Sequence, residues 1–135
     1  MAAQVAPNWF VDETSLGLAK MLAIARDDVL HPGHHDLPLV PTGTLDPVWM
    51  PIVAGMGLVV ISRDKRIRTK PAELATFTSA GLRVFWIAGK RDLNNWETLK
   101  LIVKWWDRME QIVRDRGPGP WFQAIHDTRI RELTV

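Results

Sequence analysis

The stretch Leu58-Val-Val-Ile-Ser-Arg-Asp64 carries the clearest strand signal in the sequence. Its first four residues are apolar and mostly β-branched, which is typical of a parallel strand that is buried on both faces of a sheet. The run then stops at three polar residues. The pattern therefore predicts a central strand over residues 58–61, with the carboxylate of Asp64 just beyond its carboxyl end.

Strand and helix signals alternate on both sides of this strand. Upstream, the sequence predicts a strand at 8–11, a helix capped by Thr14 that runs to about Arg26, a brief strand at 29–31, a loop from 33 to 45, and a helix that begins at Asp46-Pro47. Downstream, it predicts a helix after Pro71, a strand at 83–87, and a long helix from Asn95 to Arg116 that follows the capping box Asn94–Glu97.

This alternation predicts an α/β fold of three layers, in which a mostly parallel sheet of four to five strands lies between two layers of helices. With 135 residues, the chain is near the commonest size of one compact domain. We therefore expect a single domain over residues 1–135, with a loose leader at 1–7. The C-terminal tail at 117–135 has an alternating pattern after Thr128 that can add an edge strand.

Composition narrows the functional classes. The chain has no cysteine, which excludes disulfides, thiolate zinc sites and thiol catalysis and is compatible with a reducing cytoplasm. No segment is apolar for long enough to cross a bilayer, and none has the pattern of a signal peptide, so we expect no membrane contact and a cytoplasmic location. The net charge of +2 is too small to indicate a nucleic-acid partner by itself, so the distribution of charge must decide.

Three acids fall where α/β folds place their active sites, outside the carboxyl ends of the strands. Asp12 follows the first predicted strand, Asp64 follows the third, and Asp46 begins the helix that leads into the third. Carboxylates that converge in this way repel one another unless a hard cation such as Mg²⁺ or Mn²⁺ binds between them. Each acid also has an ordinary structural interpretation: a turn residue for Asp12, a helix N-cap for Asp46 and a solvated loop acid for Asp64.

A strip of positive charge lies beside these acids. Five of the eight residues from 63 to 70 are basic, namely Arg63, Lys65, Arg66, Arg68 and Lys70. A metal site next to such a strip suits a nuclease, because the ion can activate a water while phosphate contacts supply most of the affinity for the nucleic acid.

Several motifs spread over nearly the whole chain carry a family resemblance. They are Phe10-Val-Asp-Glu13, Leu45-Asp-Pro-Val-Trp49, Val59-Val-Ile-Ser-Arg-Asp-Lys-Arg-Ile67, Ala80-Gly-Leu-Arg-Val-Phe85 and Gly117-Pro-Gly-Pro120, of which the Asp-Lys-Arg-Ile portion is the most specific. In these motifs the chain resembles the PIN-like domains of VapC-type toxins from prokaryotic toxin–antitoxin systems.

The resemblance implies a ribonuclease that cuts RNA with Mg²⁺ or Mn²⁺ and is silenced by a cognate antitoxin protein. It also implies that Asp12, Asp46 and Asp64 are the metal ligands. PIN domains commonly carry a fourth acid after the next strand. Asp92 is the candidate at that place, and Glu13 is the alternative.

Two other functional classes fit parts of the pattern. Receiver domains place an acidic pair after their first strand and a phosphate-accepting Asp after their third, as Asp12-Glu13 and Asp64 would be. Receivers also need Ser or Thr after the fourth strand, where this chain has Ala88, and only fold-level analogy supports this alternative. A PIN-like scaffold that binds RNA or a protein without cleavage is the main alternative to a nuclease.

The remaining features concern histidine and tryptophan. His31, His34, His35 and Asp36 lie around a Pro-Gly turn without regular ligand spacing, which favours a solvated or RNA-contacting loop over a zinc site. The chain has seven Trp residues, more than a core of this size needs. Trp49 and Trp86 lie inside regular elements and are expected in the core, whereas Trp105 and Trp121 are predicted at a homodimer or antitoxin interface.

Overall fold

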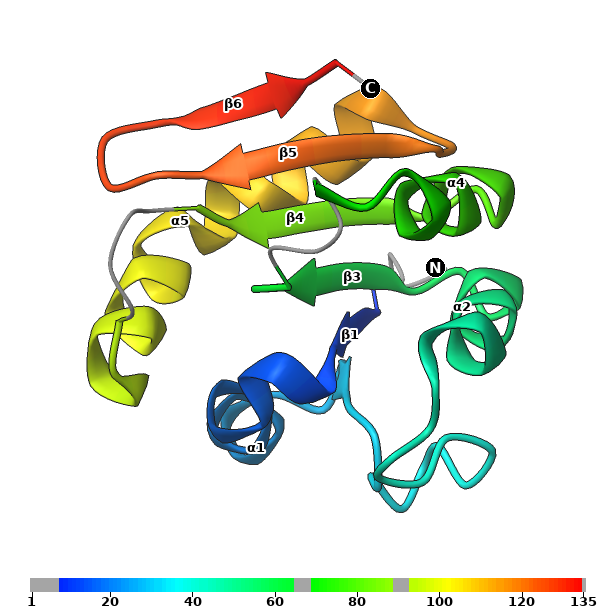
Figure 1. Cartoon of the computed structure of the whole chain (residues 1–135). Helices are drawn as coiled ribbons and strands as arrows, with labels where there is room; N and C mark the ends of the chain where they lie inside the picture. The colour runs from blue at the N-terminus through cyan, green and yellow to red at the C-terminus, as the bar shows by residue number, and fades with distance from the viewer. Residues whose placement is uncertain (1–7, 65–68, 89–92, 135) are drawn as a thin grey trace, which may run out of the picture.

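The computed structural model describes residues 8–64, 69–88 and 93–134. A mixed β-sheet lies at its centre. In this part of the chain its six strands are β1 (Trp9–Val11), β2 (Val29–Leu30), β3 (Val59–Ser62), β4 (Arg83–Ile87), β5 (Trp121–Ile125) and β6 (Ile130–Leu133). Their order is β2-β1-β3-β4-β5-β6, and all neighbours are parallel except the antiparallel pair β5 and β6 (Figure 1). The predicted α/β fold with a mostly parallel sheet is confirmed.

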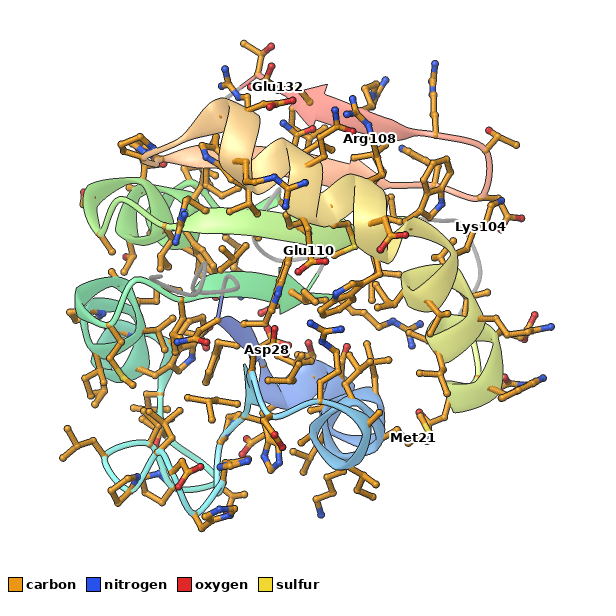
Figure 2. The ribbon with its side chains drawn as sticks, turned by 180° about the vertical axis from the view of Figure 1, so that it is seen from behind. Met21, Asp28, Lys104, Arg108, Glu110 and Glu132 are labelled. Atoms are coloured by element: carbon orange, nitrogen blue, oxygen red, sulfur yellow. The ribbon has the colours of Figure 1, made fainter. Side chains whose placement is uncertain are left out.

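Helices cover both faces of this sheet. They are the short 3-10 helix η1 (Glu13–Ser15) and the α-helices α1 (Leu16–Ala25), α2 (Asp46–Gly55), α4 (Pro71–Ser79) and α5 (Asn95–Arg116). Residues of α1 and α5 share one hydrophobic core with the sheet, and residues of α2 and α4 share the other. The long α5 runs behind the sheet in Figure 1 and in front of it in Figure 2. The three predicted layers are therefore present.

Strand β1 shows why continuous apolar runs mark the central strands. Its three residues are fully buried, and successive side chains alternate between the two faces. Trp9 and Val11 belong to the core beneath α1 and α5, whereas Phe10 belongs to the core beneath α2 and α4. A strand covered on both faces is therefore mostly apolar, as are the first three residues of β3; the exception there is the buried Ser62 at its end.

The C-terminal region contains one strand more than expected. Residues Trp121–Ile125, expected to be part of a tail, form β5, which pairs in parallel with β4 along its full length. β6 then supplies the expected edge strand. The sheet therefore exceeds the predicted four to five strands, because the chain after Gly117 returns to the sheet instead of leaving it.

The same strand corrects one prediction about an interface. Trp121 is only 3% exposed: its ring packs on Phe85, and its Nε1 donates a hydrogen bond to the carbonyl of Gly117. The prediction that Trp121 lies at a protein–protein interface is therefore wrong, because the indole fills the core between β5 and α5. Trp105 is half-buried and donates to the carbonyl of His126, so its interface role stays a prediction.

Of the other side-chain predictions, those for Trp49, Trp86 and Asn94 are confirmed, and that for Thr14 is wrong. Trp49 and Trp86 are buried, as expected. Asn94 caps α5 by accepting a hydrogen bond of 2.8 Å from the backbone N–H of Glu97, which confirms the helix start. Thr14 does not cap a helix, because it lies inside η1 and its hydroxyl donates to the carboxylate of Asp12 instead. In the described residues, no helix combines the length and the hydropathy needed to cross a membrane.

Gly119, at the entry to β5, provides a test of this packing. A Cβ at position 119 would lie 2.3 Å from the carbonyl oxygen of Gly81, and a backbone atom cannot easily move away. We expect Gly119→Ala to lower the free energy of unfolding by about 1–3 kcal/mol. Gly55→Ala is the matched control, because an added Cβ there meets nothing within 4 Å. Urea unfolding followed by circular dichroism measures both, and equal stability of the two variants would contradict the close approach.

Candidate metal centre

Acidic side chains from four elements meet at the carboxyl edge of the sheet. Asp12 directly follows β1, and Asp64 comes shortly after β3. Asp46 is the first residue of α2, and Glu73 lies in the first turn of α4. A helix that runs back against parallel strands begins at the edge where those strands end, so α2 and α4 bring their first turns to the same place.

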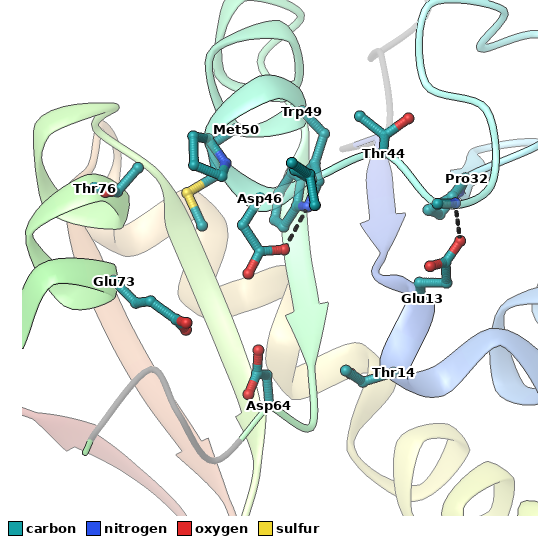
Figure 3. Close-up of a pocket in the computed structure, with 13 residues that line it drawn as sticks. Glu13, Thr14, Pro32, Thr44, Asp46, Trp49, Met50, Asp64, Glu73 and Thr76 are labelled. Atoms are coloured by element: carbon teal, nitrogen blue, oxygen red, sulfur yellow. Dashed lines mark hydrogen bonds between the residues drawn. The ribbon is translucent and has the colours of Figure 1, made fainter. Parts of the chain in front are cut away.

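Three of these acids form a compact cluster. Asp46, Asp64 and Glu73 each offer a carboxylate oxygen, and these oxygens lie within 4.8 Å of one another. Figure 3 shows the three side chains directed into a common space. The Oε2 atom of Glu73 is buried and has no hydrogen-bond partner in the described part of the chain. A buried carboxylate oxygen without a partner is costly, and a hard divalent cation satisfies it, so this donor set fits Mg²⁺ or Mn²⁺.

The hydrophobic core orients Asp46. The Oδ1 atom of Asp46 accepts a hydrogen bond of 2.9 Å from Nε1 of Trp49, whose indole packs between Phe10 and Phe77. The N-cap of α2 is Leu45, and the Asp46 side chain makes no capping hydrogen bond. The interpretation of Asp46 as a helix N-cap is therefore wrong, because its carboxylate turns toward Trp49 and the acid cluster instead of the helix end.

Ser62 links Asp12 to the position of Asp64. Its hydroxyl donates to Oδ2 of Asp12 at 2.5 Å and accepts from the backbone N–H of Asp64 at 3.0 Å. Thr14 donates to the other oxygen of Asp12. Ser62 is fully buried at the last position of β3, so this connection is rigid. Asp12 is thereby fixed relative to Asp64, although it is not one of the three acids within 4.8 Å.

The environment of Asp12 disfavours its charged form. Burial is the largest influence and raises the pKa of its carboxyl from 3.8 to about 6. The hydrogen bonds from Ser62 and Thr14 lower the pKa, and the charges of Asp64 and Asp46 raise it. An acid with a raised pKa beside other acids is typical of a functional site, and a cation close to it would lower the pKa again.

A pocket of about 400 Å³ opens onto the cluster. Its lining includes Asp46, Asp64 and Glu73, together with the apolar residues Leu45, Pro47 and Met50 and the loop residues Gly43 and Thr44. The acids are therefore open to a small ligand from one side, while the core closes the other (Figure 3).

The two candidates for a fourth ligand have different outcomes. Asp92 lies outside the described residues. Glu13 lines the pocket but is not a member of the acid cluster, because its Oε1 accepts a hydrogen bond of 2.6 Å from the backbone N–H of Gly43. Glu73, which the sequence did not single out, is the third member of the acid cluster.

Glu73 carries a weak signal in the sequence. An acid in the first turn of a helix has an ordinary explanation, since it interacts favourably with the helix dipole. The only available indication was that α4 begins at Pro71, so that its first turn lies at the edge where Asp64 also lies. Glu73 meets Asp46 only because α2 and α4 lie on the same face of the sheet, which the sequence does not show.

The basic strip is described only at its ends. The Nη1 of Arg63 donates a hydrogen bond of 3.0 Å to the carbonyl of Leu93, which connects the end of β3 to the residues just before α5. The role of Arg63 in RNA binding stays a prediction, because this contact uses only one nitrogen of the guanidinium. Lys70 is exposed at the N-cap of α4 and can meet a phosphate. Lys65, Arg66 and Arg68 lie outside the described residues.

The histidine loop forms a separate group. His34, His35 and Asp36 can present ligand atoms within 4.8 Å of one another, a proximity that the irregular spacing did not suggest. The Nδ1 atom of His34, however, accepts a hydrogen bond from the backbone N–H of Asp36. Burial and the neighbouring imidazoles lower the pKa of His34. The hydrogen bond and the ring stacking of His34 on His35 account for this group as part of the loop's own fold.

Comparison with known families agrees with this geometry. The family described as PIN like domain matches residues 7–89, which include β1 to β4 and all four acids of the site. The chain therefore belongs to the PIN-like domain family. No curated protein and no solved structure matched the chain.

The raised pKa of Asp12 makes stability depend on pH. Between pH 4 and 6 the folded protein binds a proton that the unfolded chain has released, so the free energy of unfolding falls as pH rises through this range. Removing the buried charge is worth up to about 3 kcal/mol, and losing one of the two accepted hydrogen bonds costs about 1 kcal/mol, because an amide nitrogen cannot accept. We therefore expect Asp12→Asn, measured with EDTA at pH 7.5, to be more stable than wild type by up to about 2 kcal/mol and to lose this slope. Asp115→Asn, on the exposed face of α5, is the control. Thermal unfolding at several pH values measures the effect, and an unchanged slope in Asp12→Asn would refute the assignment.

Proposed function

We propose that this protein is a metal-dependent endoribonuclease that hydrolyses RNA phosphodiesters at the acid cluster. The observation that carries the proposal is the meeting of Asp46, Asp64 and Glu73 in a pocket of a PIN-like domain, with a buried Glu73 oxygen that no described residue satisfies. The PIN-like domain family commonly consists of nucleases, and this donor set is the kind that Mg²⁺ and Mn²⁺ prefer.

In this proposal the three clustered acids hold the ion, and Asp12 adds negative charge close to Asp46 and Asp64. Both oxygens of Asp12 already accept hydrogen bonds, but each retains a lone pair for an ion or for a water. When bound, Mg²⁺ or Mn²⁺ supplies the positive charge that a phosphodiester needs as its hydrolysis proceeds. Trp49 and Ser62 keep the ligands in place, so little reorganisation is needed when substrate binds.

The cationic residues after β3 are proposed to hold the RNA backbone. Lys70 is the described member of the set, and its exposed position before α4 is close in sequence to Glu73. Lys65, Arg66 and Arg68 are proposed to act in the same way. Arg63 is proposed to belong to this set as well, with its Nη1 also bound to the carbonyl of Leu93. Contacts of this kind bring affinity without sequence specificity.

We further propose, from the motifs shared with VapC-type toxins, that the nuclease is the toxin of a type II toxin–antitoxin system that acts in the cytoplasm. A cognate antitoxin would then silence it, and a homodimer would be its working form. Trp105 remains a candidate interface residue, because its indole is partly exposed on α5. The presence of a small DNA-binding protein encoded next to this gene would support the toxin role separately from the nuclease role.

Cleavage of RNA tests the central part of this proposal. We expect purified wild-type protein to cleave structured RNA with Mn²⁺ and to lose activity in EDTA. Asp64→Asn removes a negative charge from the cluster, so we expect the rate to fall by roughly 100-fold or more, which corresponds to about 3 kcal/mol or more of transition-state stabilisation. Asp115→Asn, which removes an exposed acid from α5, should cleave at the wild-type rate.

The possible outcomes separate the alternatives. Cleavage that persists unchanged in Asp64→Asn would come from a contaminant or from another site, and it would remove Asp64 from the mechanism. A wild-type protein that binds RNA in a gel-shift assay but never cleaves it would instead identify a non-cleaving scaffold.

A further inference from the structure

Residues 31–45, which we name the pocket loop, are built from consecutive turns. The backbone N–H groups of His34, Leu37, Val40 and Thr44 each donate to a carbonyl three residues earlier. Two apolar side chains anchor the middle of the loop, since Leu37 is 2% exposed and Val40 is fully buried. The pocket loop is therefore an ordered element, although it contains no helix or strand.

The end of the pocket loop that faces the acids has fewer anchors. Gly43, Thr44 and Leu45 line the pocket, yet Gly43 is exposed and Leu45 is 71% exposed. Gly43 has a φ of +84°, a conformation that side chains rarely adopt. This wall of the pocket is thus held by backbone geometry and by few buried contacts.

Glu13 supplies a connection across the pocket to this wall. Its Oε1 atom accepts a hydrogen bond of 2.6 Å from the backbone N–H of Gly43, thirty residues later in the sequence. Glu13 belongs to η1, which is attached directly to Asp12. The contact therefore joins the segment that carries Asp12 to the loop that leads into Asp46. Figure 3 shows Glu13 pointing toward the pocket loop, on the side opposite Glu73.

We propose that Glu13 is a positioning residue that holds the pocket loop in its substrate-binding conformation, and that it does not bind the metal. The cluster of acids able to share an ion in the described residues does not include Glu13. Its carboxylate instead pairs with a peptide N–H, which is a charge-assisted hydrogen bond. This assignment rests on the proposed nuclease function only for its effect on substrate binding.

The expected consequence is a change in KM and not in kcat. Without Glu13 the wall at Gly43–Leu45 must be ordered by the substrate when it binds, which weakens binding. The acids at the reacting phosphate keep their positions, because Trp49 and Ser62 hold Asp46 and Asp64 independently. One solvent-exposed hydrogen bond corresponds to roughly a 2- to 10-fold effect.

Hydrogen exchange at the Gly43 amide tests the contact without any need for activity. We expect Glu13→Ala to speed exchange of this amide by roughly 2- to 10-fold, with little change at Val40, which is anchored separately. Glu13→Gln retains an amide oxygen that can accept the same hydrogen bond, so it should restore much of the protection. Asp36→Ala is the matched control, because it removes an acid of the pocket loop whose carboxylate pairs with His35.

Metal affinity and kinetics complete the test. We expect Glu13→Ala to bind Mn²⁺ with wild-type affinity by calorimetry and to raise KM for RNA by roughly 2- to 10-fold at unchanged kcat, with Glu13→Gln close to wild type. Unchanged exchange at Gly43 in Glu13→Ala would overturn the proposal, and so would a tenfold loss of Mn²⁺ affinity in both variants. If the wild type cleaves no RNA, the nuclease assignment fails, whereas the exchange and calorimetry results still decide the role of Glu13.

Discussion

The negative charge at the carboxyl edge of the sheet is the constraint on which the rest of the site depends. Parallel strands end together, and the helices that return along them begin at the same edge, so the topology brings Asp12, Asp46, Asp64 and Glu73 together. Burial makes this concentration of charge costly, as the raised pKa of Asp12 indicates. A divalent cation would offset this cost, and the buried oxygen of Glu73, which has no partner among the described residues, supplies a place for it.

Residues of the hydrophobic core hold the acids in place through hydrogen bonds. The indole of Trp49, held between aromatic rings of the core, orients Asp46. The buried hydroxyl of Ser62 connects Asp12 to the backbone of Asp64. The site is thus supported by the hydrophobic core on one side and opens to a pocket on the other. Preorganisation of this kind is what catalysis by an ion requires, because ligands that must move when substrate binds reduce the rate.

The sequence predicted those parts of the site that depend on local signals. Asp12 and Asp64 were identified because each follows a run of apolar residues that is typical of a buried strand. Glu73 was not predicted, because an acid in the first turn of a helix is ordinarily explained by the helix dipole. Its partners, Asp46 and Asp64, lie at the start of α2 and in the loop after β3. Strand β5 was not predicted for a similar reason. The segment Trp-Phe-Gln-Ala-Ile forms a strand by pairing with β4, and Trp121 is buried only once that pairing exists. Contacts between distant segments decided each case, and no local pattern encodes them.

The most direct test of the account is the affinity for Mn²⁺ of wild-type protein and of Glu73→Gln, measured by titration calorimetry at pH 7.5. The Gln side chain keeps the size of Glu73 but removes its charge and one anionic ligand oxygen. We predict that the wild type binds Mn²⁺ and that Glu73→Gln binds it at least about tenfold more weakly, while its circular dichroism spectrum is unchanged. Equal affinity in the two proteins would contradict the claim that Asp46, Asp64 and Glu73 form the metal centre.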